Sequence, residues 1–428
     1  MKVTGIIAEY NPFHKGHKYQ IDYCKKKLNS DYVIVAMSGD YVQRGTPALL
    51  PKHVRAEMAL RCGADLVLEM PVSVSTASAE AFAMGGVSML DGLHIVDSLC
   101  FGSEYGEVSA LMELAEILVK EPEEYRQLLK EFLNNGLSFP SARCQALTEY
   151  FKNPRNFTGD DFDGVLTPLL NQIVQILNSP NNILGIEYCK ALLRLKSNIK
   201  PVTLKRQGMG YHETLADTAA DNIPFASASA IRELLKTTLT PETISRIASQ
   251  VPDEISSLLA SSLQRNELLT EDVLDPLLSY CILKENASGL STYLDVSRDL
   301  AERIVNRSNE INGFLQAASL LKTKEVTQTR IQRALLHIIL GIREVPATVP
   351  YARVLGFRKE SSALLKEIKD SSSIPLITKL ADADSLLSEA GKVLLSKTAF
   401  ASNIYEKLLC QKSSRNFVHE YQKQIVIL

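Results

Sequence analysis

The segment 11-NPFHKGH-17 connects two stretches of different periodicity near the beginning of the chain. The stretch before it, VTGIIAEY at 3–10, is mostly apolar and rich in β-forming residues, as expected of a strand. The stretch after it, which continues to residue 28, has the spacing of an amphipathic helix. A turn from a strand into a helix brings free backbone N–H groups and the positive end of the helix to one point, which favours phosphate.

Two histidines flank one glycine inside this turn. Gly16 has no side chain, so a base or a phosphate can approach the backbone closely. His14 and His17 would lie at the beginning of the helix, where they can donate hydrogen bonds to phosphate oxygens. A zinc pair is disfavoured because the further ligands that zinc needs are not evident. A surface turn with two solvated histidines is the plain alternative, and the position after a first parallel strand weighs against it.

Three further strand-like runs alternate with helical patterns in the N-terminal part. The runs are YVIVAMSG (32–39), DLVLEMPV (65–72) and SLCFGSE (98–104), and the helical patterns lie at 52–62 and 76–90. This alternation predicts βαβ units in a Rossmann-like parallel sheet, which is an α/β fold. Ligands of such sheets bind at the carboxyl ends of the strands, where NPFHKGH, MSGDYVQRG, EMP and FGSE all fall.

The length of 428 residues exceeds what one ordinary core needs, so we expect two domains. We place a nucleotide-binding catalytic domain at 1–235, with a helical insertion at 108–175 whose role stays open. The remainder, 236–428, is Leu- and Ser-rich, has a helical period and shows no convincing pattern of a parallel strand. It is predicted to be a mainly α-helical C-terminal domain.

Composition limits the class of protein. The net charge is −2, so no global field draws the chain to nucleic acid and any basic surface must be local. Seven cysteines without a C-x-x-C pair argue against a disulfide framework or a zinc site, and favour a reducing, cytoplasmic location. The sequence shows no signal-peptide pattern and no apolar run long enough for a membrane span, so we expect no membrane partner.

HKGH in this position resembles the H-x-G-H signature of a nucleotidyltransferase superfamily. SASAIR at 227–232 is similar to its second signature, a Ser/Thr-rich turn with Ile-Arg opening a helix, although an ordinary helix cap would look alike. The motifs GIIAEYNPFHKGH, MSGDYVQRG, GADLVLEMP, FGSE, PNNILGIEY and KRQGMGYH, in this order, resemble the bacterial tRNA(Met) cytidine acetate ligase family. The resemblance covers most of 1–235 and continues more weakly through TQTRIQRALLHIILGI and ARVLGF beyond residue 327.

This resemblance implies a ligase that activates acetate with ATP as acetyl-adenylate and releases pyrophosphate. The acetyl group would then pass to the wobble cytidine of elongator tRNA(Met), giving N4-acetylcytidine and AMP. ATP with Mg²⁺, acetate and that tRNA are the implied co-substrates and partners, without a metal site made by the protein itself. The oligomeric state stays open.

The resemblance also implies roles for individual residues. His14 and His17 would stabilise charge at the α-phosphorus, and Ser227, Ser229 and Arg232 would hold the β- and γ-phosphates. Asn181 is alternatively a helix cap and Arg206 alternatively a solvated charge. The implied ATP contacts are Ile7, Ala8, Glu9, Tyr10, Asn11, Pro12, Phe13, His14, Lys15, Gly16, His17, Lys18, Tyr19, Gln20, Gly102, Asn181, Arg206, Ser227, Ser229 and Arg232.

Magnitudes show why the two histidines are needed. A well-placed donor to a transition-state charge contributes roughly 2.7–4 kcal/mol. A helix N-terminus contributes about 0.3–1 kcal/mol, and up to about 2 kcal/mol when partly buried. The helix end alone is therefore too weak, and side-chain donors must supply the rest.

A local basic region lies at 301–360, with ten Lys or Arg residues against five Glu and no Asp. In TRIQRALLHIILGI at 329–342, Ile331, Leu335, Ile338 and Ile342 fall on one helical face. Arg330, Arg333 and His337 fall on another face, which suits the phosphate backbone of tRNA or is simply solvated. With the family resemblance, tRNA binding by Arg330 and Arg333 is the favoured hypothesis.

Several questions stay open from the sequence. QRG at 43–45, with Lys52 and Arg55, would meet acetate or tRNA, or would be surface charges. No general base for the cytidine amine can be assigned. Two other functions compete: a nucleotidyltransferase that adenylylates a small metabolite, and a non-catalytic protein that binds ATP or RNA.

Overall fold

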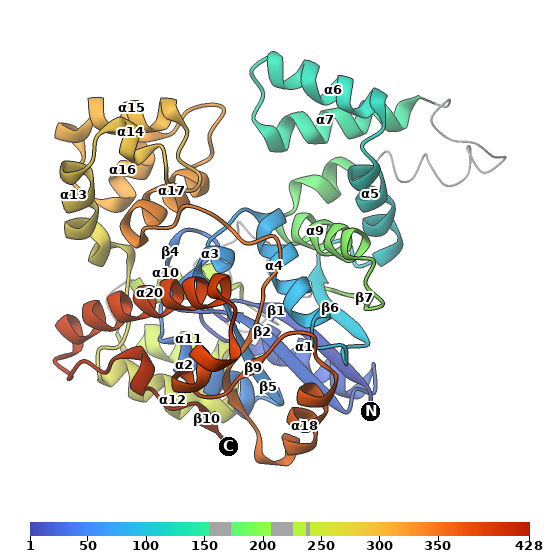
Figure 1. The fold of residues 1–428 in the computed structure, drawn as a ribbon, viewed down its shortest axis with the longest axis vertical. Coiled ribbons are helices and arrows are strands. Elements are labelled where there is room, and N and C mark those ends of the chain that lie inside the picture. The colour runs from blue at the N-terminus through green and yellow to red at the C-terminus, as the bar shows by residue number, and fades with distance from the viewer. Residues whose placement is uncertain (154–172, 207–225, 237–239) are drawn as a thin grey trace.

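The computed structural model describes residues 1–153, 173–206, 226–236 and 240–428. Its centre is a mixed, mainly parallel sheet with the strand order β10-β8-β5-β2-β1-β6-β7 and with β9 beside β8 (Figure 1). A separate small hairpin pairs β3 with β4. The strands are β1 (Val3–Ala8), β2 (Tyr32–Ser38), β3 (Tyr41–Val42), β4 (Thr46–Pro47), β5 (Leu66–Met70), β6 (Ser98–Ser103), β7 (Lys200–Lys205), β8 (Ala352–Phe357), β9 (Leu376–Ile377) and β10 (Val426–Ile427).

The predicted parallel sheet is confirmed. β5, β2, β1, β6 and β7 all run in the same direction, and the four strands predicted from the sequence appear within two residues of their expected ends. β7 adds an outer strand beside β6 that the sequence analysis did not include. The carboxyl ends of β1, β6 and β7 therefore meet along one edge.

Helices cover both faces of the sheet, because alternate residues of each strand point to opposite sides. Ile7, Ile34 and Leu68 pack on the side of α4, α5 and α9, whereas Ile6 and Val35 pack on the side of α1, α2 and α10–α12. The helices of this part are α1 (Lys15–Lys26), α2 (Lys52–Arg61), α3 (Val72–Ser75), α4 (Ala79–Asp91), α5 (Val108–Lys120), α6 (Glu123–Asn134), α7 (Phe139–Lys152), α9 (Pro180–Leu195), α10 (Ala228–Lys236), α11 (Pro241–Gln250) and α12 (Asp253–Gln264).

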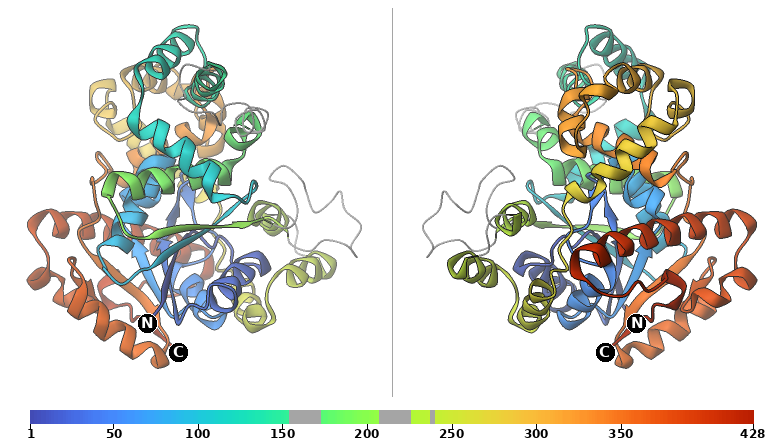
Figure 2. Two further views of the ribbon diagram at one scale, coloured as in Figure 1. Left: turned by 90° about the vertical axis from the view of Figure 1, so that its right-hand side faces the viewer. Right: turned by 90° about the vertical axis from the view of Figure 1, so that its left-hand side faces the viewer.

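Two helical projections rise from the same end of the sheet (Figures 1 and 2). One contains α5–α7, which match the predicted helical insertion over its described part; residues 154–172 of that insertion lie outside the described chain. The other contains α13–α17 and has its own apolar core, to which α20 contributes. The remaining helices are α13 (Asp275–Lys284), α14 (Ala287–Leu290), α15 (Arg298–Asn306), α16 (Phe314–Leu321), α17 (Gln328–Leu340), α18 (Ser362–Ser371), α19 (Ala383–Leu386) and α20 (Glu389–Ser413).

The C-terminal part is mainly helical, but it also returns to the sheet. β8 pairs antiparallel with β5, and β9 and β10 then pair in parallel with β8. The core around Ile6 also includes residues of α11 and α12, so it continues across residue 236. The sequence analysis missed these strands because β8 is one short run among helices and β9 and β10 have two residues each. No helix in the described part of the chain has the length and apolar character needed to cross a membrane.

Candidate active site

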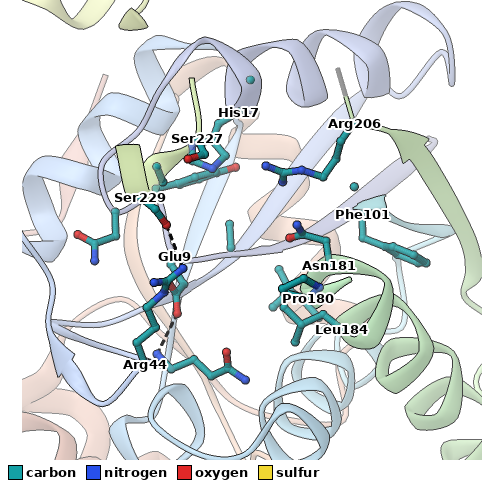
Figure 3. Close-up of a pocket in the computed structure, with 18 of the residues that line it drawn as sticks. Glu9, His17, Arg44, Phe101, Pro180, Asn181, Leu184, Arg206, Ser227 and Ser229 are labelled. Carbon is teal, nitrogen blue, oxygen red and sulfur yellow. Dashed lines mark hydrogen bonds between the residues drawn. The ribbon is translucent and has the colours of Figure 1, made fainter. Parts of the chain in front are cut away.

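A cavity of about 570 Å³ opens where β1, β6 and β7 end (Figure 3). Its walls come from the turn after β1, the beginning of α10, the beginning of α9 and the first turn of α17. The first and last lining residues, Ile7 and Arg333, are more than 300 positions apart in the sequence. The cavity is therefore shared by the turn after β1 and by both helical projections, since Pro140 of α7 also lines it.

Most residues expected to contact ATP line this cavity. They are Ile7, Ala8, Glu9, Tyr10, Asn11, His14, Gly16, His17, Tyr19, Gln20, Gly102, Asn181, Arg206, Ser227, Ser229 and Arg232. Pro12, Phe13, Lys15 and Lys18 of the expected set do not line it. Phe13 is packed in the core, and Lys18 lies 2.9 Å from a carboxylate oxygen of Glu254, because this side of α1 faces away from the cavity.

The two histidines are locked together at the beginning of α1. The backbone N–H of Gly16 donates to Nδ1 of His14 at 3.0 Å, and the backbone N–H of His14 donates to Nδ1 of His17 at 3.2 Å. The imidazole rings stack with their centres 3.7 Å apart. This reciprocal capping satisfies two of the free donors at the helix start and fixes both rings.

The same hydrogen bonds determine which nitrogen carries the proton. Both Nδ1 atoms accept, so a neutral ring of His14 or His17 is protonated at Nε2 and can donate from that atom. Burial lowers the pKa of His14 to about 3, with smaller effects from the cationic Arg206 and Arg232. Burial also lowers the pKa of His17 well below its usual value, followed by the effects of His14 and Arg206. Both residues are therefore neutral donors at physiological pH.

The SASAIR segment forms the wall next to the histidine turn (Figure 3). Ser227 Oγ accepts the N–H of Ala230 at 3.2 Å, so this serine caps α10 as well as lining the cavity. Arg232 donates from Nη1 to the carbonyl of Asn11 at 2.7 Å and from Nη2 to Ser229 Oγ at 3.0 Å. Arg232 thus ties the second signature directly to the first.

A third wall carries Asn181, Arg206 and Gly102. Nδ2 of Asn181 donates to Glu104 at 2.6 Å, which orients the amide, and the backbone N–H of Asn182 binds the same carboxylate at 3.1 Å. The stem of Arg206 lies over Gly102, where an added Cβ would meet Cγ of the arginine at 3.4 Å. The surface expected to hold a base or ribose is therefore shared by the glycine backbone and the arginine stem.

The residues whose roles the sequence leaves open, QRG at 43–45 with Lys52 and Arg55, fall into two groups. Gln43 and Arg44 line the cavity. Lys52 and Arg55 are buried and have structural contacts: Lys52 Nζ lies 2.6 Å from both Glu69 and Glu420, and Arg55 donates to the carbonyls of Glu9 and Ser38 at 2.6 and 3.0 Å. They therefore hold the strand ends in place.

The basic helix α17 differs in part from the expectation. Ile331, Leu335, Ile338 and Ile342 are buried, as predicted. His337 is also fully buried, contacting the carbonyls of Leu294 and Thr76, so its assignment to the basic face was wrong. It was misplaced because α17 is covered on more than one side, which a helical period does not reveal.

The two arginines of α17 also lie in different surroundings. The side chain of Arg330 is 47% exposed, and that of Arg333 is 13% exposed and lines the cavity, with Nε 3.1 Å from Asp295. Of the other cations in the basic region, Arg353 is buried between Glu69 and Glu420. The local charge therefore overstates the basic surface.

The chain resembles known proteins over its full length. The profile of a family described as HIGH Nucleotidyl Transferase matches residues 1–420. A tRNA(Met) cytidine acetate ligase of Acetivibrio thermocellus is 38% identical over 441 residues and covers 100% of both chains. One of Clostridium acetobutylicum is 41% identical, covering 89% of this chain and 90% of its own. This chain belongs to the tRNA(Met) cytidine acetate ligase family.

Solved structures of the ligase family share the fold. Thermotoga maritima TmcAL bound with alpha-thio ATP superposes with a TM-score of 0.86 at 28% identity, and its apo form with 0.88, each covering 100% of both chains. The resemblance that the sequence motifs indicated is confirmed.

Within this ligase, some lining residues had no role in the sequence analysis. Thr327 and Thr329 are the clearest case, although TQTR stood in the weaker C-terminal part of the resemblance. Phe82, Leu184 and Tyr188 supply an apolar side of the cavity and look like ordinary helix core in the sequence. The part of KRQGMGYH after Arg206 lies outside the described residues.

Proposed function

We propose that this chain activates acetate with ATP as acetyl-adenylate and transfers the acetyl group to the wobble cytidine of elongator tRNA(Met). The observation that carries the proposal is the paired histidine turn. It offers two fixed Nε2–H donors in a cavity that also reaches a projecting helical body. Relatives named tRNA(Met) cytidine acetate ligase, which cover 89–100% of this chain, support the same activity.

In this proposal the histidine side of the cavity holds ATP. His14 and His17 donate to the α-phosphate, where negative charge grows as the carboxylate of acetate attacks and pyrophosphate leaves. Ser227, Ser229 and Arg232 line the adjoining wall and would hold the β- and γ-phosphates. The residues of the range 7–20 that line the cavity, other than the Glu9 side chain, complete the nucleotide site with Gly102, Asn181 and Arg206.

Mg²⁺ is proposed to arrive on the triphosphate. This ion prefers substrate phosphates and its own waters to a cage made entirely of protein ligands. In the ranges that the structure describes, no group of three or more His, Cys, Asp or Glu side chains is arranged to hold a metal. When bound, the ion would neutralise phosphate charge, while the histidines and Arg232 provide the donors of the chain itself.

The tRNA is proposed to approach over the loop before α17. Thr327 and Thr329 of this segment line the cavity, and Lys322, Lys324 and Arg330 beside them are exposed. Lysine and arginine side chains near the mouth suit contacts to the phosphate backbone. The wobble nucleotide would enter from this side.

The test uses purified protein, ATP, Mg²⁺, radiolabelled acetate and unmodified elongator tRNA(Met). Label is expected in N4-acetylcytidine after digestion of the tRNA, and is expected to be lost with His14→Ala. Acetyl-CoA should not replace acetate with ATP. Binding of ATP without any labelled nucleoside would refute the proposal and would favour adenylylation of a small metabolite instead. The match to the ligases over the whole chain argues against that alternative.

A further inference from the structure

One part of the cavity combines a carboxylate with two arginines, a mixture that a triphosphate alone does not explain. Beyond the histidines and the serines, it is bounded by Glu9, Gln43 and Arg44 and by the first turn of α17. The apolar faces of Phe82 and Tyr188 also line the cavity. A flat polar group, recognised along one edge and covered by apolar side chains, fits such a space better than phosphate does.

Glu9 is the residue that most clearly favours a polar base over a phosphate in this part of the cavity. Among the described residues that line the cavity it is the only acidic one, and a carboxylate repels phosphate. The backbone N–H of Gln43 donates to Oε1 of Glu9 at 2.8 Å, so the carboxylate is held in position. Burial raises the pKa of the Tyr188 hydroxyl, and the charge of Glu9 raises it further. A fixed carboxylate in this setting is suited to accept hydrogen bonds from an amine.

Arg44 lies beside Glu9 and comes from the tight β3–β4 hairpin (Figure 3). Its Nη2 donates to Ser229 Oγ at 3.0 Å, so the guanidinium is held at the SASAIR segment. The preceding residue, Gln43, holds the Glu9 carboxylate. Gly45 allows the hairpin to pack closely against α17. Its φ is +77°, and an added Cβ would collide with the backbone N of Arg333. The hairpin thus fixes an acceptor through Gln43 and carries a forked donor at the next residue, Arg44.

This pair matches one pyrimidine edge. Cytosine presents an amino donor at N4 and acceptors at N3 and O2, so the amine can donate to Glu9 while the ring accepts from Arg44. Uracil presents an acceptor at O4 and would face the carboxylate unfavourably. Next to this pair, Thr327, Thr329 and Arg333 offer hydroxyl and guanidinium donors of the kind that contact sugar and phosphate.

We infer that Glu9 and Arg44 form the acceptor subsite, which takes the splayed-out cytosine base of the RNA substrate and directs its N4 amine at the acetyl group. This inference rests on the proposed function. The N4–C bond forms as the bond between the acetyl carbon and the phosphate oxygen breaks. The electron pair leaves with AMP, and the amine proton passes to the Glu9 carboxylate. Glu9 is then the general base that the sequence did not reveal.

The first experiment compares two partial reactions in Glu9→Gln. Acetate-dependent exchange of pyrophosphate into ATP needs no RNA, whereas single-turnover transfer of the acetyl group needs the acceptor subsite. Transfer is expected to fall at least about tenfold more than exchange. Glu233→Gln, a 72% exposed carboxylate on α10, is the matched control and should lower neither. Equal losses in both reactions, or a raised Mg²⁺ requirement for exchange, would overturn the assignment.

The second experiment measures binding, so it does not depend on turnover. Wild-type protein with a non-hydrolysable ATP analogue is titrated with tRNA carrying cytidine or uridine at the wobble position. Wild type should prefer cytidine by roughly 5- to 150-fold, the range that a good pair of base-edge hydrogen bonds provides. Glu9→Gln should lose or reverse this preference, because an amide can donate to O4 of uracil. An unchanged preference would refute the subsite, whereas absent exchange in wild type would refute the proposed function alone.

Discussion

The substitution His14→Asn separates two roles of His14, which are capping α1 through Nδ1 and donating a hydrogen bond from Nε2. The ring accepts the N–H of Gly16 through Nδ1 at 3.0 Å, and it lines the cavity with its Nε2–H available for donation. Asparagine is among the strongest helix-capping residues, so its side-chain oxygen can replace Nδ1, but it has no atom that corresponds to Nε2. Activation of acetate should therefore fall about 10²- to 10³-fold, the effect of losing one preorganised donor.

The cost in stability should be much smaller. The ring of His14 is stacked on His17 at 3.7 Å, and losing such a contact costs about 0.5–1.5 kcal/mol. His14→Ala should lose a further 0.5–2 kcal/mol, roughly, because the cap disappears as well. Acetate-dependent ATP–pyrophosphate exchange and urea unfolding of both variants measure the two effects. Near-normal exchange in His14→Asn, or stability as low as that of His14→Ala, would refute the separation of roles.

Four further outcomes follow from the geometry. Since burial lowers the pKa of His14 to about 3, the unfolded chain takes up this proton below about pH 6.5 while the native state does not. Between pH 7.5 and pH 5, wild type should therefore lose about 2 kcal/mol more stability than His14→Asn. Glu420→Gln should cost about 3–5 kcal/mol, because it leaves Lys52 and Arg353, each 2.6 Å from the carboxylate, as poorly compensated buried cations. Gly45→Ala should be destabilising and should impair acetyl transfer more than ATP binding, because its Cβ would collide with the α17 backbone. Arg330→Glu should weaken tRNA binding and leave ATP binding intact, since this side chain is exposed outside the cavity.

Matched controls make these outcomes decisive. Glu389→Gln breaks an ion pair whose carboxylate is 88% exposed and should cost no more than about 1 kcal/mol. Gly136→Ala has nearly the same backbone strain as Gly45→Ala, with φ of +79°, but nothing lies within 4 Å of its added Cβ. Equal unfolding midpoints for Glu420→Gln and Glu389→Gln, or for Gly45→Ala and Gly136→Ala, would contradict the stability predictions. An equal dependence of stability on pH in wild type and His14→Asn would contradict the pH prediction. Unchanged tRNA affinity of Arg330→Glu in a filter-binding assay would contradict the last prediction.

The sequence revealed the parts of the site that depend on local order. His14, His17 and Gly16 lie on a turn between a strand and a helix, and both elements have a clear period. The placement of Thr327 and Arg333 at the same cavity depends on packing between α17 and the β3–β4 hairpin, which no local pattern encodes. His337 shows the converse error, because a polar side chain on a helix was taken for surface although two backbone carbonyls hold it in the interior.

Glu9 illustrates a different limit. It was recognised as part of the motif around the first turn, but a sequence does not say which way a side chain leaves a strand end. Only the structure shows that the carboxylate accepts the backbone N–H of Gln43, on the β3–β4 hairpin.

The late return of β8 to the sheet has a consequence for synthesis of the chain on the ribosome. β5 ends at Met70, and its partner on that side begins at Ala352, so 281 residues lie between the two strands. At 5–20 residues per second, one edge of β5 waits roughly 14–56 s for its native partner. An unpaired, apolar strand edge is a template for pairing between chains, so nascent copies on one polysome are vulnerable to aggregation during this interval.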